Sequence, residues 1–178
     1  MTPVRTLTCA CGKVHFELDR TPIVSAECHC TSCREAGARL EALPGAPAVR
    51  EQNGGTRFVL YRKDRVRIVE GAGLLRAFFL APTSTTRRVI AGCCNTPMFL
   101  EFKGGHWLSL YATLWPAQQR PLPQLRTMTS DRTSPEPLGD DIPSGPLQSA
   151  TFFAGLLGAW IAMGFKVPKV PITGTLEA

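Results

Sequence analysis

Three cysteines within six residues are the part of this sequence best suited to chemistry. The segment CHCTSCR places them at Cys28, Cys30 and Cys33. In an extended chain, residues i and i+2 point to the same side, so Cys28 and Cys30 can face one metal ion while His29 faces away. A turn over the next three residues returns Cys33 to the same point. Three thiolates suit zinc and leave one position of a tetrahedral ion to be filled.

A second pair of cysteines, Cys9 and Cys11, shares a face in the segment CACG. Two ligands cannot complete a site, and Cys94 in the segment CCNTP is their natural partner. A C-x-x-C knuckle would place its first cysteine at position 91, where the chain has Ala91. Cys93 directly precedes Cys94, and both would face one ion only in a rearranged turn. We therefore predict a weak or empty site of Cys9, Cys11 and Cys94, and leave the part of Cys93 open.

The elements that must position these cysteines have the pattern of short β-strands. Residues 13–18 alternate between apolar and polar side chains, and further β-prone runs separated by glycine and proline follow as far as residue 114. This pattern predicts a mainly β domain over residues 1–115, built as a compact sandwich or barrel-like fold. The segment after the cysteine cluster, residues 31–43, is expected to form a short helix.

The remaining residues, 116–178, are predicted to be an appendage of the same domain. Residues 116–146 are rich in proline and are expected to form an irregular surface segment. Residues 150–165 carry no charge and predict an apolar C-terminal helix. Such a helix spans only about 24 Å, whereas a hydrocarbon core is about 30 Å thick. We expect it to pack on the β domain or in a homodimer, and we expect no membrane span.

The motifs CACGKVHFEL, CHCTSCREAG and CCNTPMFLEF, taken together, resemble those of the glutathione-dependent formaldehyde-activating enzyme and centromere-protein-V family over residues 5–115. The resemblance implies an all-β "tent" fold with two zinc ions. It implies a structural zinc on Cys9, Cys11 and Cys94, with the family's fourth ligand falling on Ala91. Asn95 stands where that family has glycine, and asparagine tolerates a positive φ better than most residues.

The resemblance also assigns a working zinc to the cluster of three cysteines, with room for a substrate thiol. It implies a zinc-dependent enzyme of carbon–sulfur lyase type, which acts on a glutathione-like thiol and a small aldehyde such as formaldehyde. The catalytic residues would be Cys28, Cys30 and Cys33. Arg34 follows the cluster directly, and it could hold a substrate carboxylate or offset the negative charge of the thiolates.

The alternative is a non-catalytic, zinc-stabilised β module that binds a protein or nucleic-acid partner. His106, His15 or Cys93 could then close the coordination of the cluster. Nucleic-acid binding is the less favoured form, although an arginine-rich stretch surrounds Tyr61, because Asp64 and Glu70 dilute its charge.

Composition indicates the charge of possible ligands and the cellular location, but it does not choose among these functions. The net charge of +6 and the pI of about 9.2 favour acidic ligands of any size. The N-terminal residues lack the apolar segment of a signal peptide, which predicts a cytoplasmic protein with reduced cysteines. Seven clustered cysteines in a reducing compartment indicate metal ligands rather than disulfides.

Overall fold

The computed structural model describes residues 4–135 and 137–177, and these form a mainly β fold with two α-helices. The helices are α1 (Thr31–Glu41) and α2 (Pro146–Ile161). The strands are β1 (Arg5–Thr8), β2 (His15–Leu18), β3 (Val24–Cys28), β4 (Thr56–Arg62), β5 (Val66–Glu70), β6 (Leu75–Phe78), β7 (Thr86–Ala91), β8 (Thr96–Phe102), β9 (Trp107–Tyr111), β10 (Leu125–Thr127) and β11 (Gly174–Leu176).

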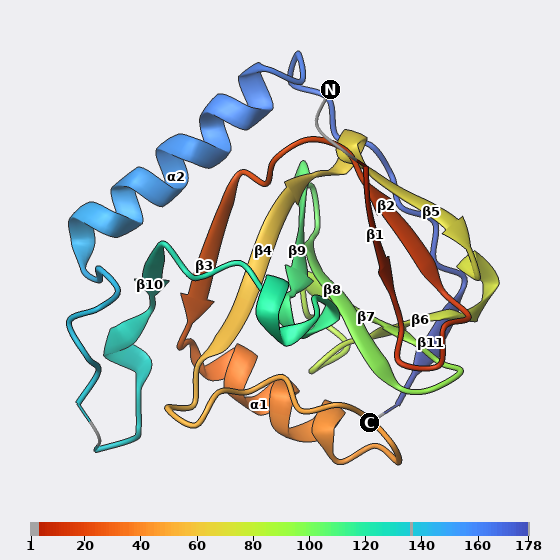
Figure 1. The fold of residues 1–178 in the computed structure, drawn as a ribbon, viewed down its shortest axis with the longest axis horizontal. Helices are drawn as coiled ribbons and strands as arrows, with labels where there is room; N and C mark the ends of the chain where they lie inside the picture. Colours follow the sequence, from red (N-terminus) through yellow and green to blue (C-terminus); the bar gives the residue numbers. More distant parts are fainter. Residues whose placement is uncertain (1–3, 136, 178) are drawn as a thin grey trace.

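The strands form one large and one small sheet. The large sheet has the order β10-β3-β4-β9-β8-β7-β6-β11, and the small sheet has the order β1-β2-β5. All pairings are antiparallel except those of the two outermost strands, because β10 runs parallel to β3 and β11 runs parallel to β6. Figure 1 shows the small sheet beside β7 and β8, with α1 and α2 on other sides of the large sheet.

The main core lies between the two sheets. Val14, Phe16 and Leu18 are fully buried, as the alternation of residues 13–18 predicts. They belong to one apolar cluster with Phe99 and Leu110 of the large sheet. The rings of Phe16 and Phe99 lie 5.9 Å apart between centroids. The apolar face of residues 13–18 thus became the inner face of the small sheet.

A second apolar cluster joins the large sheet to both helices. Ala36 and Leu40 of α1 and Leu156 of α2 belong to it, together with Phe58 and Ile90 of the sheet. The helix α2 begins at Pro146, earlier than the uncharged run that predicted it, because proline is favoured in the first helical turn. No helix in the described part of the chain is long and apolar enough to cross a membrane.

The segment after residue 115 supplies both edges of the large sheet. Strand β10 pairs with β3 so that Thr127 lies opposite Cys28, and β11 pairs with β6. The proline-rich segment therefore contains a strand, which its composition did not predict. Because β10 ends at the level of Cys28, this segment also borders the three-cysteine cluster.

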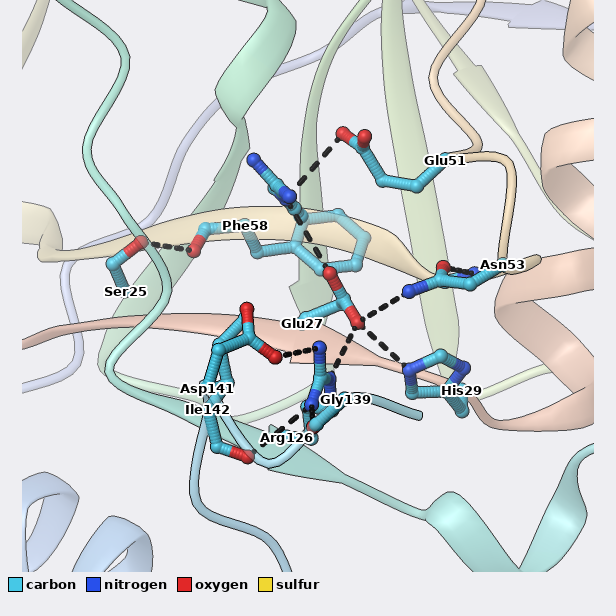
Figure 2. Close-up of polar contacts among 12 residues, drawn as sticks. Ser25, Glu27, His29, Glu51, Asn53, Phe58, Arg126, Gly139, Asp141 and Ile142 are labelled. Atoms are coloured by element: carbon cyan, nitrogen blue, oxygen red, sulfur yellow. Dashed lines mark hydrogen bonds and ion pairs between the residues drawn. The ribbon is translucent and has the colours of Figure 1, made fainter. Parts of the chain in front are cut away.

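A buried carboxylate holds the proline-rich segment against the sheet, as Figure 2 shows. Glu27 is fully buried and accepts hydrogen bonds from His29 Nε2 at 2.9 Å, Asn53 Nδ2 at 3.0 Å and Arg126 Nε at 3.0 Å. Arg57 Nε lies 3.3 Å from its second oxygen. Arg126 in turn donates to the carbonyl groups of Gly139 and Ile142. Strands β3, β4 and β10 are thus joined at one charge-assisted network.

Candidate metal centres

The strand β3 and the helix α1 together bring the sulfurs of Cys28, Cys30 and Cys33 to one point. Cys28 is the last residue of β3, Cys30 is the N-cap of α1, and Cys33 lies in its first turn. The Cys33 N–H donates to Cys30 Sγ at 3.4 Å, which is an N-cap hydrogen bond with sulfur in the usual place of oxygen. The three Sγ atoms all lie within 4.8 Å of one another. We call this group the three-cysteine centre.

The position of Cys30 favours a negative sulfur. The N-terminus of a helix carries a partial positive charge, which stabilises a thiolate. Hydrogen bonds from Cys28 and Cys33 lower the pKa of Cys30 to about 2. The same contacts raise the pKa of Cys28, through Cys30 first, and that of Cys33, through Cys28 and Cys30. The contacts among the three sulfurs therefore favour a negative charge on Cys30 over one on Cys28 or Cys33.

No further histidine, cysteine, aspartate or glutamate of the described residues joins the three-cysteine centre. His29 is not part of this group, as expected, and its Nε2 bonds to Glu27 at 2.9 Å (Figure 2). His106 donates from Nε2 to the Leu156 carbonyl at 2.8 Å. His15 bonds to the Gly12 carbonyl at 2.6 Å, and Cys93 belongs to the other cysteine group. The three side chains that could have closed this centre are therefore engaged elsewhere.

Arg34 lies on α1 with its guanidinium turned towards the proline-rich segment. It donates to the Asp131 carbonyl and to the Thr31 hydroxyl. The Asp131 carboxylate lies 3.4 Å from the Thr31 N–H at the start of α1. Arg34 therefore fastens the N-terminus of the helix to the segment that borders the centre, and its role towards a substrate stays a prediction.

The second group consists of Cys9, Cys11, Cys93 and Cys94, and we call it the four-cysteine centre. The first two lie in the turn between β1 and β2, and the others lie in the turn between β7 and β8. Four of the Sγ–Sγ distances are 3.6, 3.8, 3.3 and 3.9 Å. Thiolates at 2.3 Å from a tetrahedral zinc would lie about 3.8 Å apart. The geometry therefore fits a tetrahedral metal ion held by four sulfurs.

The place of Cys93, which the sequence left open, is with Cys9, Cys11 and Cys94, because all four sulfurs lie together. The chain makes a tight turn in which the Cys94 N–H bonds to the Ala91 carbonyl at 3.2 Å, and Asn95 has a φ of 54°. Asn95 thus adopts the left-handed conformation expected of it. In this turn both neighbouring cysteines reach the same point, whereas regular backbone would separate them. Only the adjacency of the two cysteines hinted at this, and the sequence could not decide it.

The neighbouring thiols of Cys93 and Cys94 differ in their tendency to ionise. Burial, together with hydrogen bonds to Cys11 and Cys9, raises the pKa of Cys93 to about 12. Burial also works to raise the pKa of Cys94, but hydrogen bonds from Thr96 and from the backbone of Cys11 lower it to about 6. The Thr96 hydroxyl lies 3.0 Å from Cys94 Sγ. A bound cation would favour the ionised form of Cys93.

Two surface hollows, of about 300 and 230 Å³, lie elsewhere on the protein. Neither is lined by a cysteine. Cys28 and Cys30 are nevertheless partly exposed, whereas Cys33 is buried. A ligand would therefore reach the three-cysteine centre directly from the surface.

The arginine-rich stretch around Tyr61 is largely neutralised within the protein. Four of its basic side chains form ion pairs with carboxylates, namely Arg57 with Glu27 and Glu51, Arg62 with Asp64, Lys63 with Glu101, and Arg67 with Glu17. Such pairing reduces the positive charge that a nucleic acid would meet.

A family model described as a family of unknown function, DUF6151, matches residues 1–113. The chain belongs to this family. All seven cysteines of this DUF6151 protein fall within the matched residues, whereas β10, α2 and β11 lie beyond them. Among solved structures, the crystal structure of a Rhodobacter sphaeroides protein is 17% identical, with a TM-score of 0.46. The match covers 79% of this chain and 100% of that one. No curated protein matches the chain.

Proposed function

We propose that this DUF6151 protein is a zinc-dependent enzyme of carbon–sulfur lyase type. Its substrates would be a glutathione-like thiol and a small aldehyde such as formaldehyde. The observation that carries the proposal is the contrast between the two centres. Four protein ligands are typical of structural zinc, whereas three ligands and an open position are typical of catalytic zinc. We assign these roles to the four-cysteine and three-cysteine centres, respectively.

The choice of zinc follows from the chemistry of the ligands. Both centres consist of cysteine sulfur, and soft thiolates select zinc over magnesium, calcium or manganese. The cytoplasm, which we propose as the location, keeps such thiols reduced. Metal analysis of protein purified without added zinc is the direct measurement, and two equivalents are expected.

The residues of the three-cysteine centre would have distinct tasks. Bound zinc would supply a position at which a substrate thiol is held as its thiolate. Cys28, Cys30 and Cys33 hold the ion, and the start of α1 stabilises the negative charge around Cys30. Arg34 would hold a carboxylate of the thiol substrate. In the overall reaction the substrate sulfur forms a bond to the aldehyde carbon, and the thiol proton passes to the aldehyde oxygen, so that no oxidant is required.

Cobalt substitution tests whether the fourth position is open. Thiolate-to-cobalt charge-transfer bands respond to a new sulfur ligand, so glutathione should change the spectrum of the cobalt protein. The Cys33→Ser variant should lose this response. The four-cysteine centre is saturated and should not respond, which makes it an internal control. If the wild-type spectrum is indifferent to every thiol tried, the fourth position is closed and the alternative, a non-catalytic zinc module, is to be preferred.

A further inference from the structure

Arg88 is a charged residue in the interior of the protein. It lies on β7 and is only 2% exposed. Because side chains alternate along a strand, Arg88 shares a face with Ile90, which packs in the apolar cluster with α1. Among the described residues, no carboxylate lies within ion-pair distance of its guanidinium, whereas its neighbour Arg87 pairs with Glu101. A buried guanidinium without a partner of opposite charge is strongly unfavourable.

Two hydrogen bonds of Arg88 lead to the three-cysteine centre. Its Nη2 donates to the Ser32 carbonyl at 2.9 Å and to the Ser32 hydroxyl at 3.2 Å. Ser32 lies between Cys30 and Cys33 in the chain, and its Oγ is 3.6 Å from Cys30 Sγ. The Nε of Arg88 is buried without a hydrogen-bond partner. The guanidinium thus lies behind the first turn of α1, on the residue that separates two of the ligands.

The neighbouring Tyr111 supports this placement. Tyr111 is 2% exposed, and burial raises its pKa. Arg88 lowers this pKa through its charge and a side-chain hydrogen bond, whereas Cys33 and Glu41 raise it. Arg88, Cys33 and Tyr111 are all buried, and Glu41 at the other end of α1 also acts on the Tyr111 hydroxyl. A charge at the centre is therefore felt by Arg88 with little screening from water.

The missing negative partner of Arg88 is the centre itself. Three thiolates around a divalent ion carry a net charge of −1, and a guanidinium carries +1. We propose that Arg88 is the counter-ion of the metal-loaded three-cysteine centre and a positioning residue that orients its ligands through Ser32. This inference rests on the metal proposed above for that centre. It does not depend on the thiol chemistry.

The test is the affinity of the two centres for zinc, measured by competition with a chelating dye. Removing an outer partner of a metal ligand commonly weakens binding by about 10- to 100-fold. Arg88→Met should lower the affinity for one equivalent of zinc by this factor and leave the affinity for the other equivalent unchanged. Cys33→Ser identifies which equivalent belongs to the three-cysteine centre. Arg88→Lys keeps the charge but loses the planar guanidinium, so it should lose less zinc affinity than Arg88→Met.

Arg39→Met is the matched control, because Arg39 lies on the same helix but pairs with Glu35 at the surface. It should bind zinc like the wild type. Equal affinity of Arg88→Met and wild type at both centres would overturn the inference while leaving the proposed function intact. A wild type without zinc at the three-cysteine centre would instead remove the proposed function, and the inference with it.

A variant that fails to fold need not end the test. Ser32→Ala removes the hydroxyl that bonds to Arg88 and lies near Cys30, and it keeps the charge. It should weaken the same equivalent several-fold and shift the charge-transfer bands of the cobalt protein. If Arg88→Met is unfolded, unchanged zinc affinity and an unchanged cobalt spectrum in Ser32→Ala would overturn the inference.

Discussion

Single residues decide the coordination of both centres. In the turn between β7 and β8, Cys93 supplies the sulfur that a C-x-x-C knuckle would have supplied from position 91. Ala91 is itself fully buried in the core. The ligand has therefore moved by two positions along the chain, and the tight turn around Cys94 makes this possible.

Cys93→Ser should accordingly lose one equivalent of zinc and unfold at a lower temperature, because the four-cysteine centre joins the turns of two sheets. The double variant Ala91→Cys/Cys93→Ser rebuilds the knuckle and should regain most of the zinc. Ala91→Cys alone should gain none, since four sulfurs are already present. Metal analysis and thermal unfolding measure these changes. Full zinc content in Cys93→Ser would show that Cys93 is not a ligand.

At the scale of elements, the end of α1 is fastened to the loop that follows it. Glu41 accepts hydrogen bonds from the Val49 and Arg50 N–H groups at 2.8 and 2.7 Å. Its second oxygen accepts from the Arg50 guanidinium at 2.8 and 2.7 Å. Burial works to raise the pKa of Glu41, but the hydrogen bonds from Arg50 and Val49 outweigh it and lower this pKa. The loop is thereby held against the helix that carries Cys30 and Cys33.

The depressed pKa of Glu41 makes its contribution to stability dependent on pH. The stabilisation is present above the ordinary value of 4.5 and is lost as the pH falls through the lower folded value. Glu41→Gln should reduce the free energy of unfolding by about 1–2 kcal/mol at pH 7, and by less below pH 4. Glu35→Gln is the control, because Glu35 pairs only with exposed Arg39. Denaturant unfolding of both variants at several pH values measures these changes. An equal loss of unfolding free energy in Glu41→Gln and Glu35→Gln would contradict the prediction.

At the scale of the whole molecule, Glu27 fastens the proline-rich segment to the family core. Glu27→Gln removes the buried carboxylate partner of Arg126 and leaves it Asp141, whose side chain is 69% exposed. Breaking a buried ion pair costs about 3–5 kcal/mol. Residues 128–145 should then become sensitive to limited proteolysis. Glu51→Gln is the control, since Glu51 touches the same Arg57 from a more exposed position. Equal protease resistance in both variants would count against this role.

The exposed apolar side chains of α2 bear on whether the protein forms a dimer. Phe153, Leu157, Ile161 and Phe165 recur every four residues and are 52–65% exposed. A parallel row of Ala154, Gly158 and Ala162 leaves space for the large side chains of a second copy. We therefore predict a homodimer through α2. Leu157→Glu should make the protein monomeric by light scattering, whereas Leu122→Glu, which changes an exposed leucine elsewhere, should not. A wild-type monomer at high concentration would contradict this.

The sequence by itself determined the local features of this protein. Periodicity predicted the buried faces of the strands, as Phe16 and Leu18 show, because a period of two places one face in the core. The C-x-C-x-x-C spacing predicted that three sulfurs would converge. The reason is local, because the end of β3 and the first turn of α1 alone bring them together. The conformation of Asn95 followed from its residue type.

The tertiary structure alone decided what depends on contacts between distant segments. The meeting of Cys93 with Cys9 and Cys11 required two turns to approach across the sheets, and the strand β10 required a partner in β3. No sequence pattern marked Arg88 as buried, and only the packing of α1 over β7 places it beside Ser32. Sequence patterns record which face of an element is apolar. They do not record which element covers that face. The covering element determines which partners a buried charge such as Arg88 finds.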